Sequence, residues 1–378
     1  MASTPSADKP LRVAVIGLGW AGVTHVENYA AIPDVRVVAI ASQERDKMAE
    51  VARRFDVPAE FSSWEDLIEG SDIDALSICT PNYLHHPICL SALRAGIHVL
   101  CEKPLALDSR QASEMVQAAE QANRVLRTVF NFRHRGDVQI LRESVASGAL
   151  GKVYYAKASW MRRNHFQEVP GWNAHKETAG GGPLIDLGVH MLDLVLYSLG
   201  EPDVVRASGV TYNDLASAWI EAHGGSPGSW EVEDLGSGLL RLADGSSILL
   251  EASWALNGPV ANDEMRIDLY GSRGGAALLI RNSAESNTLR FFVNFLGAAA
   301  EVVPEVPAGH GHAGVIRDFV DTIRSGDWSA HHGKEGLVRS RILDALYFSA
   351  SHGHEVAVAD FPGALGAATA PVERAQVD

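Results

Sequence analysis

The feature that most constrains the fold is a glycine motif near the start of the chain. Residues 11–16 are a short apolar, β-branched run that predicts a buried strand. Gly17-Leu18-Gly19-Trp20-Ala21-Gly22 follows at once and opens a predicted helix to about residue 31. A GxGxxG motif between a strand and a helix places bare backbone and a helix N-terminus against a diphosphate. We predict that Gly17, Gly19, Trp20, Ala21 and Gly22 bind a dinucleotide; a tight turn without a ligand is the alternative.

Strand and helix patterns alternate as far as residue 130. Strands are predicted at 35–42, 73–79, 97–101 and 125–130, and helices at 45–55, 86–95 and 108–123. This alternation predicts an α/β domain over residues 9–130, with a doubly wound parallel sheet that binds ligands at the carboxyl ends of its strands. The residues predicted at those ends, and hence at the cofactor, are Thr80, Pro81, Asn82, His85, Glu102 and Lys103.

The residues after the second strand bear on which dinucleotide binds. An acidic residue about 20 positions past the glycines usually bonds the ribose 2′-hydroxyl of NAD. Here that place holds Ser42 and Gln43, with Arg45 close behind. A small hydroxyl and a nearby guanidinium suit a 2′-phosphate, so the sequence favours NADP. NAD is the alternative, because Glu44 could turn inward.

The pattern changes after residue 130. Strands are predicted at 153–160, 204–210, 237–242, 246–252 and 265–270, with Asp244-Gly245 as a hairpin turn between two of them. Closing helices are predicted at 313–325 and 337–353. Residues 131–362 are therefore expected to form an α+β domain with a large, mostly antiparallel open sheet. The polar or Ala- and Gly-rich residues 1–8 and 363–378 are expected to be loose tails.

A second glycine-led segment carries candidate acid/base residues. Gly180-Gly181-Gly182 precedes Pro183, which suits the first turn of a helix. On that helix Asp186, His190 and Asp193 lie on one face. Such an arrangement suits a carboxylate that orients an imidazole and raises its basicity. A capped helix with a polar outer face is the alternative.

Composition excludes several other classes of function. A net charge of −15 without an offsetting basic run argues against a nucleic-acid or anionic-membrane partner. Neither a signal peptide nor a membrane-length apolar run is apparent. Cys79, Cys89 and Cys101 show no paired spacing and are expected in a reducing, cytoplasmic protein. His310-Gly311-His312 and His331-His332 come without a third ligand, so no metal site is predicted.

Four motifs in this order give the chain a specific resemblance. They are Gly17-Leu18-Gly19-Trp20-Ala21-Gly22; Thr80-Pro81-Asn82 with His85; Glu102-Lys103-Pro104; and Gly181-Gly182-x-x-x-Asp186-x-Gly188-x-His190-x-x-Asp193. Over roughly residues 11–360 the chain resembles the Gfo/Idh/MocA oxidoreductases, the group of glucose–fructose oxidoreductase and inositol dehydrogenase.

The resemblance implies a Rossmann domain, a substrate domain with an open sheet, and hydride transfer. The hydride would pass between NAD(P) and a hydroxyl or ketone of a sugar, sugar derivative or cyclitol. By position, Lys103, Asp186 and His190 would be the catalytic set. Either Lys103 or His190 would be the acid/base. A glycosidase that acts by transient oxidation and a non-catalytic dinucleotide or sugar sensor are the rival classes.

Substrate contacts are expected on the catalytic residues and on the loop before the Gly180 segment. The expected substrate-binding residues are Lys103, Arg163, Asn164, Trp172, Asp186 and His190, with Arg162, His165 and His175 as further candidates. Trp172 suits stacking on a sugar ring. An uncovered apolar sheet seldom stays monomeric, so a homodimer or homotetramer is expected.

Overall fold

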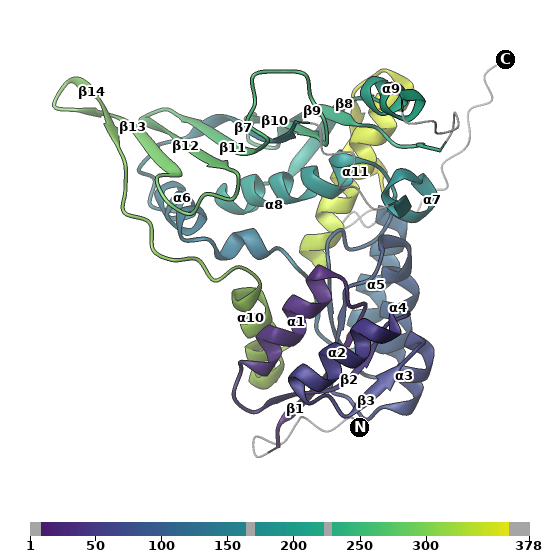
Figure 1. Cartoon of the computed structure of the whole chain (residues 1–378). Helices are drawn as coiled ribbons and strands as arrows, with labels where there is room; N and C mark the ends of the chain where they lie inside the picture. Colours follow the sequence, from purple (N-terminus) through teal and green to yellow (C-terminus); the bar gives the residue numbers. More distant parts are fainter. Residues whose placement is uncertain (1–8, 164–170, 223–228, 363–378) are drawn as a thin grey trace.

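The protein consists of two sheets with their helices, one at each end of the molecule (Figure 1). The computed structural model describes residues 9–163, 171–222 and 229–362. Asn164, His165 and the predicted tails at 1–8 and 363–378 lie outside the described residues.

The first sheet is parallel and has the strand order β3-β2-β1-β4-β5-β6. Its strands are β1 (Leu11–Ile16), β2 (Val35–Ala41), β3 (Ala59–Phe61), β4 (Ala75–Ile78), β5 (His98–Cys101) and β6 (Leu126–Thr128). The chain reverses direction across the sheet between β1 and β4, which is the position where doubly wound folds bind ligands. The predicted doubly wound parallel sheet is confirmed.

Helices cover both faces of this sheet. They are α1 (Trp20–Ala30), α2 (Arg45–Phe55), α3 (Trp64–Gly70), α4 (His85–Arg94) and α5 (Ser109–Ala122). One apolar core includes residues of α1 and α2, and a separate one includes residues of α3, α4 and α5. Side-chain caps stand at two helix starts: Ser63 Oγ accepts from the Asp66 N–H at 3.0 Å, and Asp108 Oδ1 accepts from the Gln111 N–H at 2.7 Å. They fix where α3 and α5 begin.

The second sheet has nine strands in the order β14-β13-β12-β11-β7-β10-β9-β8-β15. They are β7 (Val153–Arg162), β8 (Val204–Tyr212), β9 (Leu235–Leu242), β10 (Ser247–Ser253), β11 (Asp263–Gly271), β12 (Gly274–Arg281), β13 (Leu289–Phe295), β14 (Ala298–Val302) and β15 (Val356–Ala357). Every pairing is antiparallel except that of β7 with β10. The mostly antiparallel sheet and the Asp244-Gly245 hairpin are confirmed.

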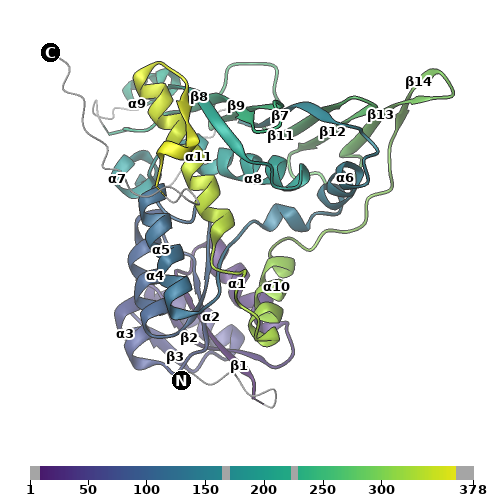
Figure 2. The same ribbon diagram turned by 180° about the vertical axis from the view of Figure 1, so that it is seen from behind.

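In the described part of the chain, helices cover one face of this sheet and leave the other uncovered (Figure 2). The helices α6 (Gly136–Ala146), α8 (Val189–Ser198) and α11 (Lys334–His352) lie on the covered side. Alternate residues of the strands point towards them; on β10 these are Ile248, Leu250 and Ala252, all buried. Lys176–Ser198 is long and apolar enough to cross a membrane, but 89% of its apolar window is buried inside the protein, as suits a core segment.

Some elements depart from the sequence prediction. The short helices α7 (Lys176–Ala179) and α9 (Asp214–Ala222), together with α6 and strands β3 and β12–β14, were not predicted. Strand β3 has three residues, too few to show a period. Strand β13 is mostly exposed or half-exposed, so its residues do not alternate between apolar and polar as a half-buried strand would.

The last helices return to the first sheet. The helix α10 (Gly311–Ser325) packs against α1, and its apolar residues join the core there (Figure 1). His332 then forms a parallel bridge with Leu126 of β6 before α11 begins. A boundary at residue 130 therefore separates the two sheets but not the helices that pack on them.

Candidate active site

A single cavity of about 1100 Å³ runs between the two sheets. Of the predicted site residues, those that line it are Gly17, Gly19, Trp20, Ala21, Ser42, Gln43, Thr80, Pro81, Asn82, Glu102, Lys103, Trp172, Asp186 and His190. Gly22, Arg45, His85 and Arg163 are not among the lining residues, and Asn164 lies outside the described part of the chain. Residues far apart in the sequence thus meet in one space.

The centre of the cavity holds an ion pair that joins the two sheets. Lys103 follows β5, and its Nζ donates to Asp186 Oδ1 at 2.7 Å and to the Asp186 carbonyl at 3.2 Å. The buried Trp254, just after β10, donates from Nε1 to Asp186 Oδ2 at 2.9 Å. Burial alone would raise the pKa of Asp186, but Lys103 and Trp254 outweigh it and lower that pKa to about 2. Asp186 is therefore a carboxylate at neutral pH.

The predicted Asp186–His190 pair is corrected by this geometry. Both carboxylate oxygens of Asp186 accept bonds from Lys103 and Trp254, and no hydrogen bond joins Asp186 to His190 among the described residues. The reason lies in the local helix: Leu184–Gly188 is a π-helical segment that precedes α8, so the expected α-helical spacing does not hold there. Asp186 instead forms an ion pair with Lys103.

His190 lies in an aromatic environment on the cavity wall. Its ring packs edge-on against Phe132 at 5.0 Å between centroids, and tilted against Trp160 at 5.5 Å. Burial and the nearby Lys103 charge lower the pKa of His190 well below its usual value. The imidazole is therefore neutral at physiological pH and can accept a proton from a molecule in the cavity.

The glycine loop before Asp186 is held by a residue that the sequence did not single out. Glu233, just before β9, is buried and accepts from the Gly182 N–H at 2.9 Å and the Leu184 N–H at 3.0 Å. Tyr347 of α11 donates to the same carboxylate at 2.8 Å. A Cβ on Gly182 would lie 2.0 Å from the Glu233 carbonyl oxygen, which explains why glycine stands there. No sequence motif marks Glu233, because its partners are distant in the chain.

Asp193 does not belong to the reactive group. It is 1% exposed and bonds Arg133 and Arg339: Arg133 Nε donates to its Oδ2 at 2.8 Å, and Arg339 Nε lies 3.0 Å from its Oδ1. These contacts tie α8 to α11 and to the segment after β6. Asp193 was expected beside Asp186 and His190, but its carboxylate pairs with these arginines and does not line the cavity.

The end of the cavity beside β2 contains the residues expected at the adenosine. Ser42, Gln43 and Glu44 line it, and Ser42 Oγ accepts from the Glu44 N–H at 3.1 Å. Arg45 begins α2, is exposed, and is not among the lining residues. Glu44 therefore borders the cavity and Arg45 does not.

His85 and Gly22, both predicted at the cofactor, do not line the cavity and instead support the backbone around it. His85 is fully buried, with Nδ1 2.8 Å from the Pro104 carbonyl and Nε2 3.0 Å from the Thr80 carbonyl, so it holds together the loops after β4 and β5. A Cβ on Gly22 would lie 1.8 Å from the Gly17 carbonyl oxygen, so Gly22 permits α1 to pack on the strand. Both residues therefore stabilise the loops that line the cavity.

The opposite end of the cavity is lined from the second sheet. Trp172, Asn173 and Trp160 face it together with Arg162, whose Nε lies 3.1 Å from Asp263 Oδ2. Trp160 Nε1 donates to Asp263 Oδ1 at 2.6 Å. Arg162, the last residue of β7, lines the cavity, whereas Arg163 does not. Polar and aromatic groups converge here as in small-molecule sites.

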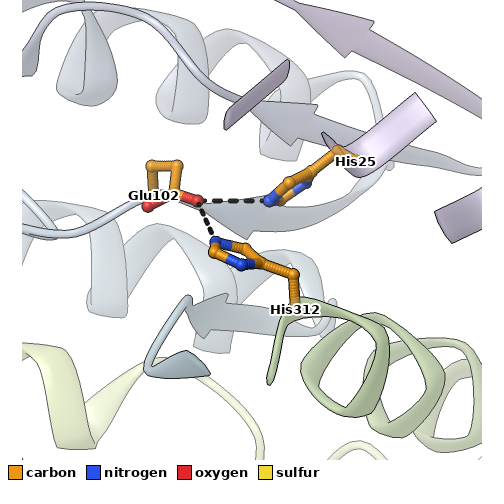
Figure 3. Close-up of side chains that lie close together, drawn as sticks. All are labelled: His25, Glu102 and His312. Atoms are coloured by element: carbon orange, nitrogen blue, oxygen red, sulfur yellow. Dashed lines mark hydrogen bonds and ion pairs between the residues drawn. The ribbon is translucent and has the colours of Figure 1, made fainter. Parts of the chain in front are cut away.

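A further polar cluster borders the cavity next to Lys103. His25 of α1, Glu102 at the end of β5 and His312 of α10 turn their polar atoms towards one another (Figure 3). Burial would raise the pKa of Glu102, but hydrogen bonds from His25 and His312 lower it well below its usual range. The sequence predicted Glu102 at the cofactor but gave no sign that two histidines meet it.

Two consecutive parts of the chain match models of one protein family. Residues 11–130 match the "Oxidoreductase family, NAD-binding Rossmann fold" and residues 138–277 match the "GFO/IDH/MocA C-terminal domain". The chain is 32% identical over 360 residues to D-glucoside 3-dehydrogenase of Escherichia coli, which covers 92% of this chain and 97% of the relative.

Further relatives agree with this match. Levoglucosan dehydrogenase of Pseudarthrobacter phenanthrenivorans is 28% identical over 380 residues, covering 90% of this chain and 96% of that one. A solved structure of levoglucosan dehydrogenase with NADH and levoglucosan superposes with a TM-score of 0.79 at 25% identity, over 93% of this chain and 100% of that chain. From its motifs, its fold and these relatives, the chain belongs to the GFO/IDH/MocA family of oxidoreductases.

Proposed function

We propose that the protein transfers hydride between a nicotinamide dinucleotide and a secondary hydroxyl or ketone of a pyranose sugar, its glycoside or a cyclitol. One observation carries the proposal: the Lys103–Asp186 ion pair and the neutral His190 border the same cavity as the Gly17–Ala21 loop. A dinucleotide laid along that loop would bring its nicotinamide towards these side chains. The names of the relatives, a glucoside and an anhydrosugar dehydrogenase, support the substrate class.

The residues present suit a dinucleotide. Gly19 precedes α1, and a Cβ there would meet nothing within 4 Å, so the backbone is open to a diphosphate at the helix N-terminus. When bound, the nicotinamide accepts the hydride from the carbon that carries the hydroxyl. The chain's own groups must therefore position that carbon and remove the hydroxyl proton.

In this proposal Lys103 stabilises the reacting oxygen, and His190 removes the hydroxyl proton. Lys103, held by Asp186, donates a hydrogen bond to the reacting oxygen and stabilises the negative charge that develops on it. His190 is neutral and accepts the hydroxyl proton at a ring nitrogen. In the reverse direction the imidazolium returns the proton to the oxygen. Asp186 fixes the ammonium group of Lys103 through the ion pair and does not itself transfer a proton.

The preferred dinucleotide is NAD in this proposal. The NADP preference from the sequence stays a prediction, and Ser42 and Gln43 remain compatible with it. The position of Glu44 on the cavity wall, with Arg45 outside it, supports a carboxylate that accepts from the ribose 2′-hydroxyl. That carboxylate would repel a 2′-phosphate.

A fluorescence titration with NADH and NADPH tests this choice. We expect tighter binding of NADH by the wild type, and a Glu44→Ala variant that binds NADPH more tightly relative to NADH. Arg45→Ala is the matched control and should leave the ratio unchanged. Tighter NADPH binding that is lost selectively in Arg45→Ala would support NADP instead.

Turnover tests the catalytic assignment. Glucosides, anhydrosugars and inositols are screened for net reduction of added NAD⁺, which a glycosidase with a retained cofactor would not give. Lys103→Ala and His190→Ala should each lower kcat by about a hundredfold or more while NADH binding is kept. Near-normal rates in both variants would overturn the site.

The cellular setting and assembly complete the proposal. Three free cysteines, two of them buried, suit a reducing cytoplasm.

The uncovered face of the nine-stranded sheet supports a homo-oligomer in which two copies meet through that face.

A further inference from the structure

His25, Glu102 and His312 each offer one nitrogen or oxygen atom as a metal ligand, and these atoms all lie within 4.8 Å of one another (Figure 3). They come from α1, from the residue that follows β5 and from α10, which are distant in the sequence. We propose that this trio binds a divalent transition-metal ion, and that zinc fits it best.

The donor set and its spacing suit zinc. Two imidazoles and one carboxylate are a known three-ligand zinc set, and tetrahedral bonds of about 2.0–2.1 Å place ligands about 3.4 Å apart. Glu102 Oε1 lies 3.2 Å from His25 Nε2 and 3.5 Å from His312 Nε2. As charge-assisted hydrogen bonds both contacts are long, since such bonds are usually about 2.7–2.9 Å. The two separations from Glu102 are thus close to those between ligands of one zinc ion.

The ligands are already oriented by neighbouring groups. His25 Nδ1 lies 2.9 Å from Ser77 Oγ, which in turn lies 2.9 Å from the Tyr29 hydroxyl. Glu102 Oε2 accepts from the Lys103 backbone N–H at 3.2 Å, which leaves Oε1 for the ion. Outer hydrogen bonds of this kind fix the imidazole orientation and raise metal affinity. Nitrogen donors disfavour Mg²⁺ and Ca²⁺, which prefer all-oxygen sites.

The fourth ligand position of the ion faces the cavity. Glu102 and His312 line that cavity, and the exposed Trp20 packs edge-on against His312 at 5.3 Å between ring centroids. Water or an oxygen of a molecule in the cavity completes the tetrahedron from this side. The ion also joins α10 to α1 and β5, because each supplies a ligand. It therefore stabilises the packing of the returning helix on the first sheet.

Cobalt is the probe for this site, because tetrahedral Co²⁺ absorbs visible light strongly. Full-length protein without an affinity tag, freed of metal by a chelator, is titrated with Co²⁺. We expect one tetrahedral ion per chain that Zn²⁺ displaces, and a higher melting temperature with either ion. His312→Ala should weaken Co²⁺ binding by about tenfold or more, because even loss of an outer-sphere partner has an effect of that size.

Two control variants make the test specific. His310→Ala removes an exposed histidine two residues from His312, and His352→Ala removes one of a pair of exposed histidines. Both should bind Co²⁺ like the wild type. Absence of tetrahedral absorption, unchanged affinity in a folded His312→Ala or His312→Gln protein, or loss of binding in His352→Ala would each overturn the proposal. The spectrum needs neither cofactor nor turnover, so these outcomes leave the proposed oxidoreductase function untouched.

Discussion

At the scale of single residues, the site keeps one positive and one negative charge while a third titratable group stays neutral. Lys103 and Asp186 form the ion pair, and His190 lies beside it among aromatic rings. Burial and the Lys103 charge both disfavour the imidazolium form. The base is therefore available at neutral pH, and the proton it accepts is easily passed on.

The titration of His190 tests this electrostatic account. In the wild type we expect the pKa of His190, followed by NMR of its ring nitrogens, to lie below about 6.5, the value of an unperturbed imidazole. Lys103→Met removes a charge that lowers this pKa, so the midpoint should move upward. In activity, the acidic limb of the pH profile for oxidation should likewise lie below that of a free histidine. An unchanged midpoint in Lys103→Met would contradict the proposed coupling.

At the scale of elements, a loop and a short irregular helix set where the reactive groups lie. The π-helical segment (Leu184–Gly188) directs Asp186 to Lys103, and Glu233 holds the preceding glycines by two backbone N–H groups. Tyr347 of α11 braces Glu233. The segment that carries the proposed catalytic residues is thus positioned by Glu233, just before β9, and by Tyr347 of α11.

Replacement of Glu233 by Gln tests its positioning role. Hydrogen bonds to a charged acceptor contribute about 1.5–3 kcal/mol each, so Glu233→Gln should lower the free energy of unfolding by about 2 kcal/mol. We expect kcat to fall about tenfold or more while KM for the cofactor is unchanged, because small misplacements of reactive groups have large effects on rate. Denaturant melts and steady-state kinetics give both quantities.

The matched control for that variant is Glu231→Gln. Glu231 is exposed, lies two residues earlier and accepts from the Lys176 backbone N–H at 3.1 Å. It should leave kcat near the wild-type value. Equal losses in both variants, or a change confined to KM for the cofactor, would show that Glu233 does not position the catalytic loop.

At the scale of the whole molecule, no helix among the described residues covers one face of the nine-stranded sheet (Figure 1). Tyr155 and Tyr270 stack there at 5.4 Å between centroids on the neighbouring strands β7 and β11. Phe292 of β13 is 46% exposed. Apolar side chains in the middle of an uncovered sheet are typical of a surface that a second copy covers.

Sedimentation velocity tests this assembly. The wild type should sediment as a dimer or larger species, and Tyr270→Glu should shift it towards monomer, because burying an unpaired carboxylate opposes association. Arg94→Glu, an exposed change on α4 at the other end of the molecule, is the control and should leave the assembly intact. A monomeric wild type, or a Tyr270→Glu protein that assembles normally, would contradict the proposed interface.

The sequence by itself determined the features that depend on neighbours along the chain. The strand-glycine-helix motif at residues 11–22, the alternation up to residue 130 and the helix start at residue 108 are local, so their patterns predicted the first sheet correctly. Lys103, Asp186 and His190 stood in recognisable motifs, and the fold brings all three to one cavity. Features that depend only on residues close together in the sequence can be predicted from the sequence alone.

Only the tertiary structure decided which of these groups touch. The pairing of Asp186 with Lys103 rather than His190, the role of Glu233, the core position of Asp193 and the meeting of His25, Glu102 and His312 all join residues from distant segments. A one-residue change in helical winding near Asp186, or the packing of α10 on α1, alters such contacts without altering any sequence period. Side-chain partners across a folded interior are fixed by packing, and packing is a property of the whole chain.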